Sequence, residues 1–81
     1  MFVKTQVRQF MREQLSDHSH PDLWQGGEVN CTRLAENAAW HFDCDHWLDD
    51  PGHWVWDVAV DVGERAEEAF EAEWTARQGG R

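Results

Sequence analysis

The sequence has no tyrosine, only two cysteines and two prolines, and few bases, with 7 Lys and Arg against 16 Asp and Glu. Two cysteines are too few for a disulfide-stabilised scaffold. Because no run of about 18 apolar residues is present, we expect no membrane span. The N-terminus is polar and amphipathic, so we also expect no signal peptide. These features together predict a cytoplasmic protein.

The formal net charge of −9 argues against direct binding to nucleic acid or to a membrane, because these polyanions would repel the chain. The same charge favours a basic protein as the partner. Most of it lies between Asp43 and Glu73, where eleven carboxylates are accompanied by a single base, Arg65.

The composition is that of a folded domain, with 41% hydrophobic and 28% charged residues. Six tryptophans and four phenylalanines can supply a core in spite of the short chain. Apolar residues recur at helical spacing in residues 2–17, 30–42 and 51–77. We predict one all-α domain over 1–81, a compact three-helix bundle with a long acidic C-terminal helix, a loop over 18–29 and a flexible tail over 78–81.

The third helix has a clear expected start, because Asp50 can serve as the N-cap and Pro51 can occupy the first helical position. Gly63 lies in the middle of this helix, where it either permits the close approach of another helix or marks a slight bend. On a helical wheel one apolar side is predicted to face the core. It consists of Val55, Val58, Ala59, Val62, Ala66, Ala69 and Phe70.

The opposite side of this helix carries carboxylates at spacings of four, three, four and three residues. They are Asp57, Asp61, Glu64, Glu68 and Glu71, and Asp49 and Asp50 continue the line. The line has one sign and few basic neighbours, and Trp56 and Trp74 lie along its edge. It is either the solvated side of the helix or a contact surface for a basic partner. Tryptophan favours the second interpretation, because it is enriched in interface hot spots, although a wide buried face would also explain it.

The first helix carries the only concentrated positive charge, in Lys4, Arg8 and Arg12. Three bases are too few for nucleic-acid contact on so acidic a chain. We expect the line to be solvated, or to face the acidic region across the bundle or across a dimer.

Zinc-type residues occur in His41, Cys44 and His46, but their fourth ligand would have to come from a distant segment. If the second helix is intact, Cys31 lies about 15 Å away from His41 along its axis. We therefore predict no metal and no cofactor. The same three residues are the closest candidate for an enzyme site. Because the surrounding carboxylates would raise the thiol pKa, we predict that the protein is not an enzyme.

Two resemblances bear on function. The segment TRLAENAA resembles the first helix of a helix-turn-helix, but the helix that follows is acidic, so DNA binding is not expected. In its size, its charge and its lack of catalytic motifs the chain is similar to phage-encoded nuclease inhibitors, including anti-CRISPR proteins, and to antitoxins that neutralise basic toxins.

The leading hypothesis is a non-enzymatic protein that binds and blocks a basic, nucleic-acid-binding partner, acting as a nucleic-acid mimic. The alternatives are a structural module, in which the tryptophan edge and the basic first helix form a homodimer, and, less favoured, a small zinc-binding domain.

Overall fold

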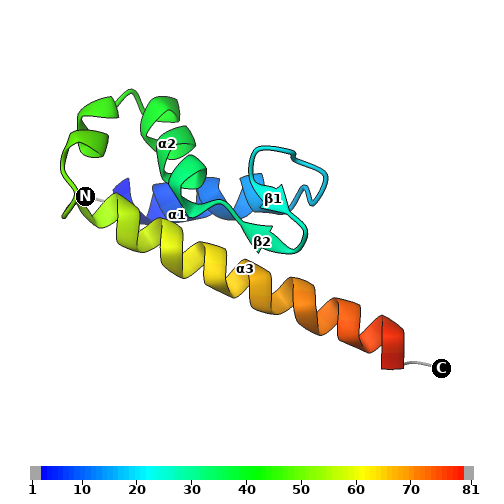
Figure 1. The fold of residues 1–81 in the computed structure, drawn as a ribbon. Helices are drawn as coiled ribbons and strands as arrows, with labels where there is room; N and C mark the ends of the chain where they lie inside the picture. Colours follow the sequence, from blue (N-terminus) through cyan, green and yellow to red (C-terminus); the bar gives the residue numbers. More distant parts are fainter. Residues whose placement is uncertain (1–2, 80–81) are drawn as a thin grey trace.

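The computed structural model describes residues 3–79 and confirms the all-α prediction, with three helices packed together and a long C-terminal helix (Figure 1). The elements in chain order are α1 (Val3–Leu15), β1 (Trp24–Gln25), β2 (Glu28–Val29), α2 (Cys31–His41), the 3-10 helix η1 (Asp45–Asp49) and α3 (Trp54–Gly79). Over the described residues, no helix combines the length and the apolar character needed to cross a bilayer.

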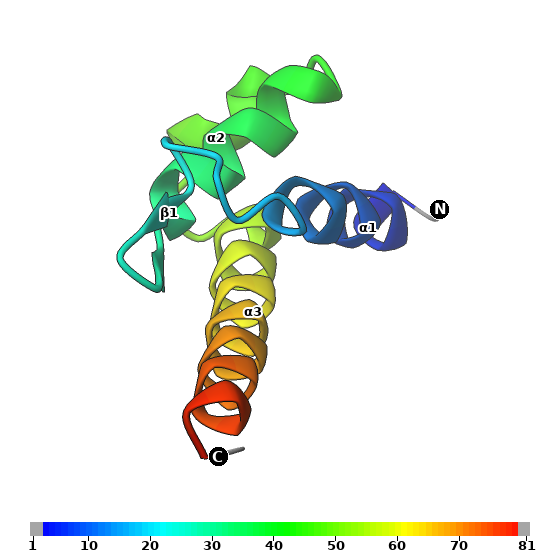
Figure 2. The same ribbon diagram turned by 90° about the vertical axis from the view of Figure 1, so that its right-hand side faces the viewer.

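The core forms where α1 and α2 both pack on the first half of α3 (Figures 1 and 2). Each helix contributes apolar residues three or four positions apart, which places them on one side of the helix. The segment between α1 and α2 adds Leu23 and Trp24, both buried. The buried helical side chains are Val7, Met11 and Leu15 of α1, Leu34, Ala35, Ala38 and Ala39 of α2, and Val55, Val58, Ala59 and Val62 of α3.

The apolar side predicted for the third helix is buried only in its first half. Ala66 and Phe70 are partly buried, and Ala69 is exposed. The reason is tertiary: α1 and α2 are shorter than α3, so its C-terminal half, from about Glu64 onward, extends beyond them (Figure 2). The molecule is accordingly elongated, with extents of 49, 24 and 19 Å. We call this C-terminal half the distal part of α3.

The start of the third helix differs from the prediction. Helix α3 begins at Trp54, because the Asp50 carboxylate accepts a hydrogen bond from the Gly52 N–H at 2.9 Å and closes a turn through Pro51. The cap is formed instead by His53, whose Nδ1 accepts from the Val55 N–H at 3.1 Å. At the other end α3 continues through Gly79, and the rest of the predicted tail, 80–81, lies outside the described residues.

The predicted loop 18–29 contains a short antiparallel hairpin in which Trp24 pairs with Val29. Its turn consists of Gly26 and Gly27, which have φ angles of +63° and +92°. Positive φ at both central residues is typical of the tight hairpin turn that suits the twist of paired strands, and glycine adopts it without a steric penalty. The hairpin lies beside α3 (Figure 1).

Gly63 of α3 lies against the beginning of α2. A Cβ atom at this position would be 2.7 Å from Sγ of Cys31 and 3.3 Å from Cγ1 of Val29. The prediction that this glycine permits the close approach of another helix is therefore confirmed.

We predict that Gly63→Ala lowers the free energy of unfolding. Overpacking costs about 1–3 kcal/mol, and the better helix propensity of alanine offsets about 1 kcal/mol of this. Urea unfolding followed by circular dichroism measures the change. In a Cys31→Ala background the cost of Gly63→Ala should fall, because the closest atom is gone.

The matched control is Gly52→Ala, where the new Cβ would meet only Asp50 Oδ1 at an ordinary 3.6 Å. We expect a change of less than about 0.5 kcal/mol there. Equal stability losses for Gly63→Ala with and without Cys31 would contradict the close contact.

Candidate functional site

The hairpin turn and the distal part of α3 enclose a groove of about 340 Å³. Its lining is both acidic and aromatic. Its lining consists of Gly26, Gly27 and Glu28 from the hairpin and Glu67, Phe70, Glu71 and Trp74 from α3. We call it the acidic–aromatic groove.

Glu67 fixes the geometry of this groove. Its Oε2 accepts a hydrogen bond from the backbone N–H of Val29 at 2.6 Å. Bonds of this kind, with an ionised acceptor, are stronger than neutral ones. The contact ties the hairpin to α3 and so holds Glu28 beside the helix.

The aromatic wall is part of a larger cluster. Phe70 packs against Gly27, and its ring centroid lies 5.2 Å from that of Trp24 and 5.3 Å from that of His18. Trp24 is held in turn by its indole N–H, which donates to the Leu15 carbonyl at 3.0 Å. Trp74 extends the cluster by one helical turn but is 55% exposed. The cluster is buried and hydrogen-bonded at Trp24 and open to solvent at Trp74.

This combination of groups suits a cation. Carboxylates bind guanidinium and ammonium groups by charge-assisted hydrogen bonds. Aromatic faces attract the same cations and also pack against the apolar stem of an arginine or lysine side chain. The groove therefore combines the two kinds of group, carboxylate and aromatic, that bind a guanidinium or an ammonium group.

The predicted acidic line is divided by the fold. Glu64, Glu68 and Glu71 are exposed on the distal part of α3, while Asp57 is exposed in its first turn. Asp61 is only partly exposed, because Arg8 of α1 and Arg65 of α3 both donate to it.

The expectation that the line has few basic partners is therefore wrong at Asp61. The expectation that the basic line of the first helix faces the acids across the bundle is confirmed for Arg8. Lys4 instead lies 5.7 Å above the ring of Trp54.

The remaining predicted contact residues lie at the other end of α3. Asp49, the last residue of η1, and Asp50, which follows it, are both exposed. Trp56 is half-buried against the core, and its indole N–H donates to the Asp50 carbonyl at 3.0 Å. A separation of 18 residues in the helix places Trp56 and Trp74 about 27 Å apart along α3.

The zinc-type residues are used in packing. His41 stacks on Phe10 with ring centroids 4.2 Å apart, and Sγ of Cys44 donates to the Phe42 carbonyl at 3.3 Å. Within residues 3–79 no three His, Cys, Asp or Glu side chains are placed to hold a metal ion. Burial raises the pKa of the Cys31 thiol, and Glu67 and Glu64 add to the effect.

Sequence reasoning missed Glu28 and Glu67 as site residues and assigned Phe70 wholly to the core. The Gly26–Gly27 pair was the available signal, because it is typical of a hairpin that would bring Glu28 back toward a helix.

Comparison of the chain with protein-family models, with curated proteins and with solved structures finds no match.

We predict a pH-dependent stability difference between the wild type and Arg8→Gln. The hydrogen bond from Arg8, followed by that from Arg65, holds the pKa of the Asp61 carboxyl below its usual range. A lowered folded-state pKa stabilises the fold above the unfolded value of about 3.9, and this stabilisation is lost as the pH falls through the folded value. The gap in Tm should be full at pH 7 and should close at acidic pH below that unfolded value.

Arg77→Gln is the control, because its contact with Glu73 is long, at 4.0 Å, and highly exposed. We expect it to change Tm little at any pH. A gap for Arg8→Gln that stayed constant down to the lowest pH would show that Asp61 is not its partner.

Proposed function

We propose that the protein binds a basic protein partner through the distal part of α3 and covers the surface with which that partner holds nucleic acid. The observation that carries the proposal is the acidic–aromatic groove, in which Glu28, Glu67 and Glu71 lie beside Phe70 and Trp74. This lining suits an arginine or lysine side chain of the partner. We infer a role in binding, without catalysis.

The charge around the groove supports the same partner. Glu64, Glu68 and Glu71 continue the acidic surface along the exposed helix. A surface of one sign attracts an oppositely charged partner over several ångströms and speeds the encounter. A basic surface that normally binds phosphates is the complement of such a line, and a protein that occupies it would exclude nucleic acid.

The fold changes which residues we assign to the contact. The charge of Asp61 is matched by two bases, Arg8 and Arg65, so we leave Asp61 out. Asp49, Asp50 and Asp57 lie near the start of α3, away from the groove. The proposed contact residues are Glu28, Glu64, Glu67, Glu68, Glu71, Phe70 and Trp74.

We predict that the triple reversal Glu64→Lys, Glu68→Lys and Glu71→Lys abolishes partner capture. The wild type and the variant are used as baits in a lysate at low and at high salt, because screening weakens contacts between exposed charges. A nucleic-acid-binding protein retained by the wild type alone, and released at high salt, is the expected result. The purified partner should then lose binding to a labelled DNA or RNA oligonucleotide when the wild-type protein is added.

The matched control is the triple reversal of Glu13, Asp22 and Asp45 to Lys, which makes the same change of net charge at exposed sites outside α3. This control should retain the partner if binding depends on the acids of α3 and not on the total charge of the protein. Equal recovery by all three baits, or a partner that still binds its oligonucleotide in the complex, would contradict the proposal.

We predict that Trp74→Ala weakens binding of the captured partner at least tenfold, about 1.4 kcal/mol, because exposed tryptophans beside charged groups are frequent interface anchors. Titration calorimetry measures the change. Trp40→Ala is the control, since Trp40 on α2 is 52% exposed and lies away from the groove. Similar losses for the two variants would show that Trp74 has no special role.

A further inference from the structure

The distal part of α3 has a second side on which no other element of residues 3–79 packs. Ala69, Ala72, Glu73 and Ala76 are all exposed on it. Figure 2 shows this part of α3 extending away from α1. Most helices in proteins are stabilised by the packing of one side, and short helices alone are marginal in water. This side is therefore the natural place for a further packing contact.

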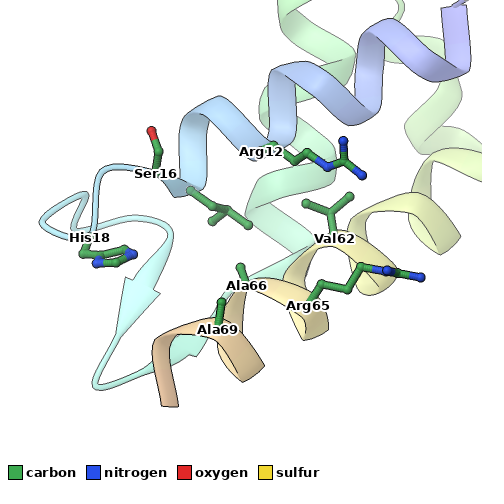
Figure 3. Close-up of a pocket in the computed structure, with 8 residues that line it drawn as sticks. Arg12, Ser16, His18, Val62, Arg65, Ala66 and Ala69 are labelled. Carbon is green, nitrogen blue, oxygen red and sulfur yellow. The ribbon is translucent and has the colours of Figure 1, made fainter. Parts of the chain in front are cut away.

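A second groove, of about 260 Å³, lies at the base of this side, where α1 ends and α3 continues. Leu15, Val62 and Ala66 form its apolar surface. Figure 3 shows Arg12 of α1 and Arg65 of α3 reaching out on either side of Val62. The groove is basic and apolar on a protein with a net charge of −9, so its occupant should be acidic and should present small side chains.

The distal part of α3 itself has these properties. Relative to Ala69, the residues Val62, Arg65, Ala66, Ala72, Glu73 and Ala76 lie within about 60° on a helical wheel of 100° per residue. They are arranged symmetrically about Ala69. Four residues before it is a base, Arg65, and four residues after it is an acid, Glu73.

We propose that two copies of this chain associate through antiparallel α3 helices, with a two-fold axis that passes at Ala69. In a two-fold contact the same surface is used on both subunits, so a residue before the axis meets the residue equally far after it. Arg65 of each copy then meets Glu73 of the other, Ala66 meets Ala72, and Ala76 approaches the groove that Val62 helps to line. The distal part of each α3 enters the groove of the other copy, where Arg12 adds a second positive charge near Glu73.

The charges allow this pairing. Arg65 uses Nε for its hydrogen bonds to Asp61. A guanidinium carries five N–H donors, so Arg65 can bind a second carboxylate. Within its own helix Glu73 contacts only Arg77 among the described bases, at 4.0 Å, which is a weak contact. The alanines permit the two helices to approach closely.

This dimer surface differs from the partner surface of the proposed function. On the wheel Glu64, Glu71 and Trp74 lie more than about 100° from Ala69, so they remain exposed in the dimer. The two proposals can therefore fail independently. The contact covers about four helical turns and one groove on each copy, less than the roughly 800 Å² per partner of a standard interface, so we expect a weak dimer that dissociates on dilution.

Sedimentation velocity over a range of protein concentrations tests the proposal, with far-UV circular dichroism to show that each variant is folded. The wild type should shift from monomer to dimer as its concentration rises. Glu73→Arg should raise the dissociation constant of the dimer at least tenfold, because the new arginine then faces Arg65 of the other copy. The double exchange Arg65→Glu with Glu73→Arg should restore the dimer.

The matched control is Glu71→Arg, which makes the same charge change two residues away on the other side of α3 and should leave the dimer intact. A wild type that is monomeric at every concentration overturns the proposal. So does a dimer that survives Glu73→Arg, or a folded double exchange that stays monomeric.

The position of the axis is tested by Ala69→Cys, because a residue on a two-fold axis meets its own copy. Under mild oxidation this variant should form a covalent dimer on a non-reducing gel, and Glu71→Cys should not. The wild type, which retains Cys31 and Cys44, gives the background. A folded Ala69→Cys variant that forms no more covalent dimer than the wild type overturns the proposed axis.

Discussion

The close contact of Gly63 with Val29 and Cys31 is the constraint on which the rest of the structure depends. It permits the end of the hairpin and the beginning of α2 to lie directly on α3. Val29 is then near enough for its N–H to donate to Glu67, four residues further along the helix. The turn at Gly26 and Gly27 is consequently held beside Phe70, and the acidic–aromatic groove exists only because this sequence of contacts is made.

The carboxylates of α3 have unequal roles as a result. Asp61 and Glu67 have partners within the fold, and both connect α3 to another element. Glu64, Glu68 and Glu71 remain exposed, where neighbouring like charges cost a few tenths of a kcal/mol per pair. A cationic surface would relieve this repulsion, which is the physical reason to place a basic partner there.

The length of α3 is what permits two different contacts on one helix. Its distal part extends beyond α1 and α2, so all of its sides are accessible except that beside the hairpin (Figure 2). The side with Glu64 and Glu71 suits a basic protein, while the side centred on Ala69 suits a copy of itself. Because these sides point in different directions, one contact does not exclude the other.

The sequence by itself determined the three helices and the mixed character of α3, because these follow from local periodicity. It left two interpretations of Gly63 open, a close contact or a bend, and the packing of Val29 and Cys31 on this residue decided between them. It did not determine where α3 begins, since a turn closed by Asp50 competes with a helix start at Pro51. Nor could it separate Asp61 from the other acids of the line, or bring Glu28 to Glu67. Those outcomes depend on which residues of distant segments meet, and only the packing of α1 and the hairpin on α3 decides that.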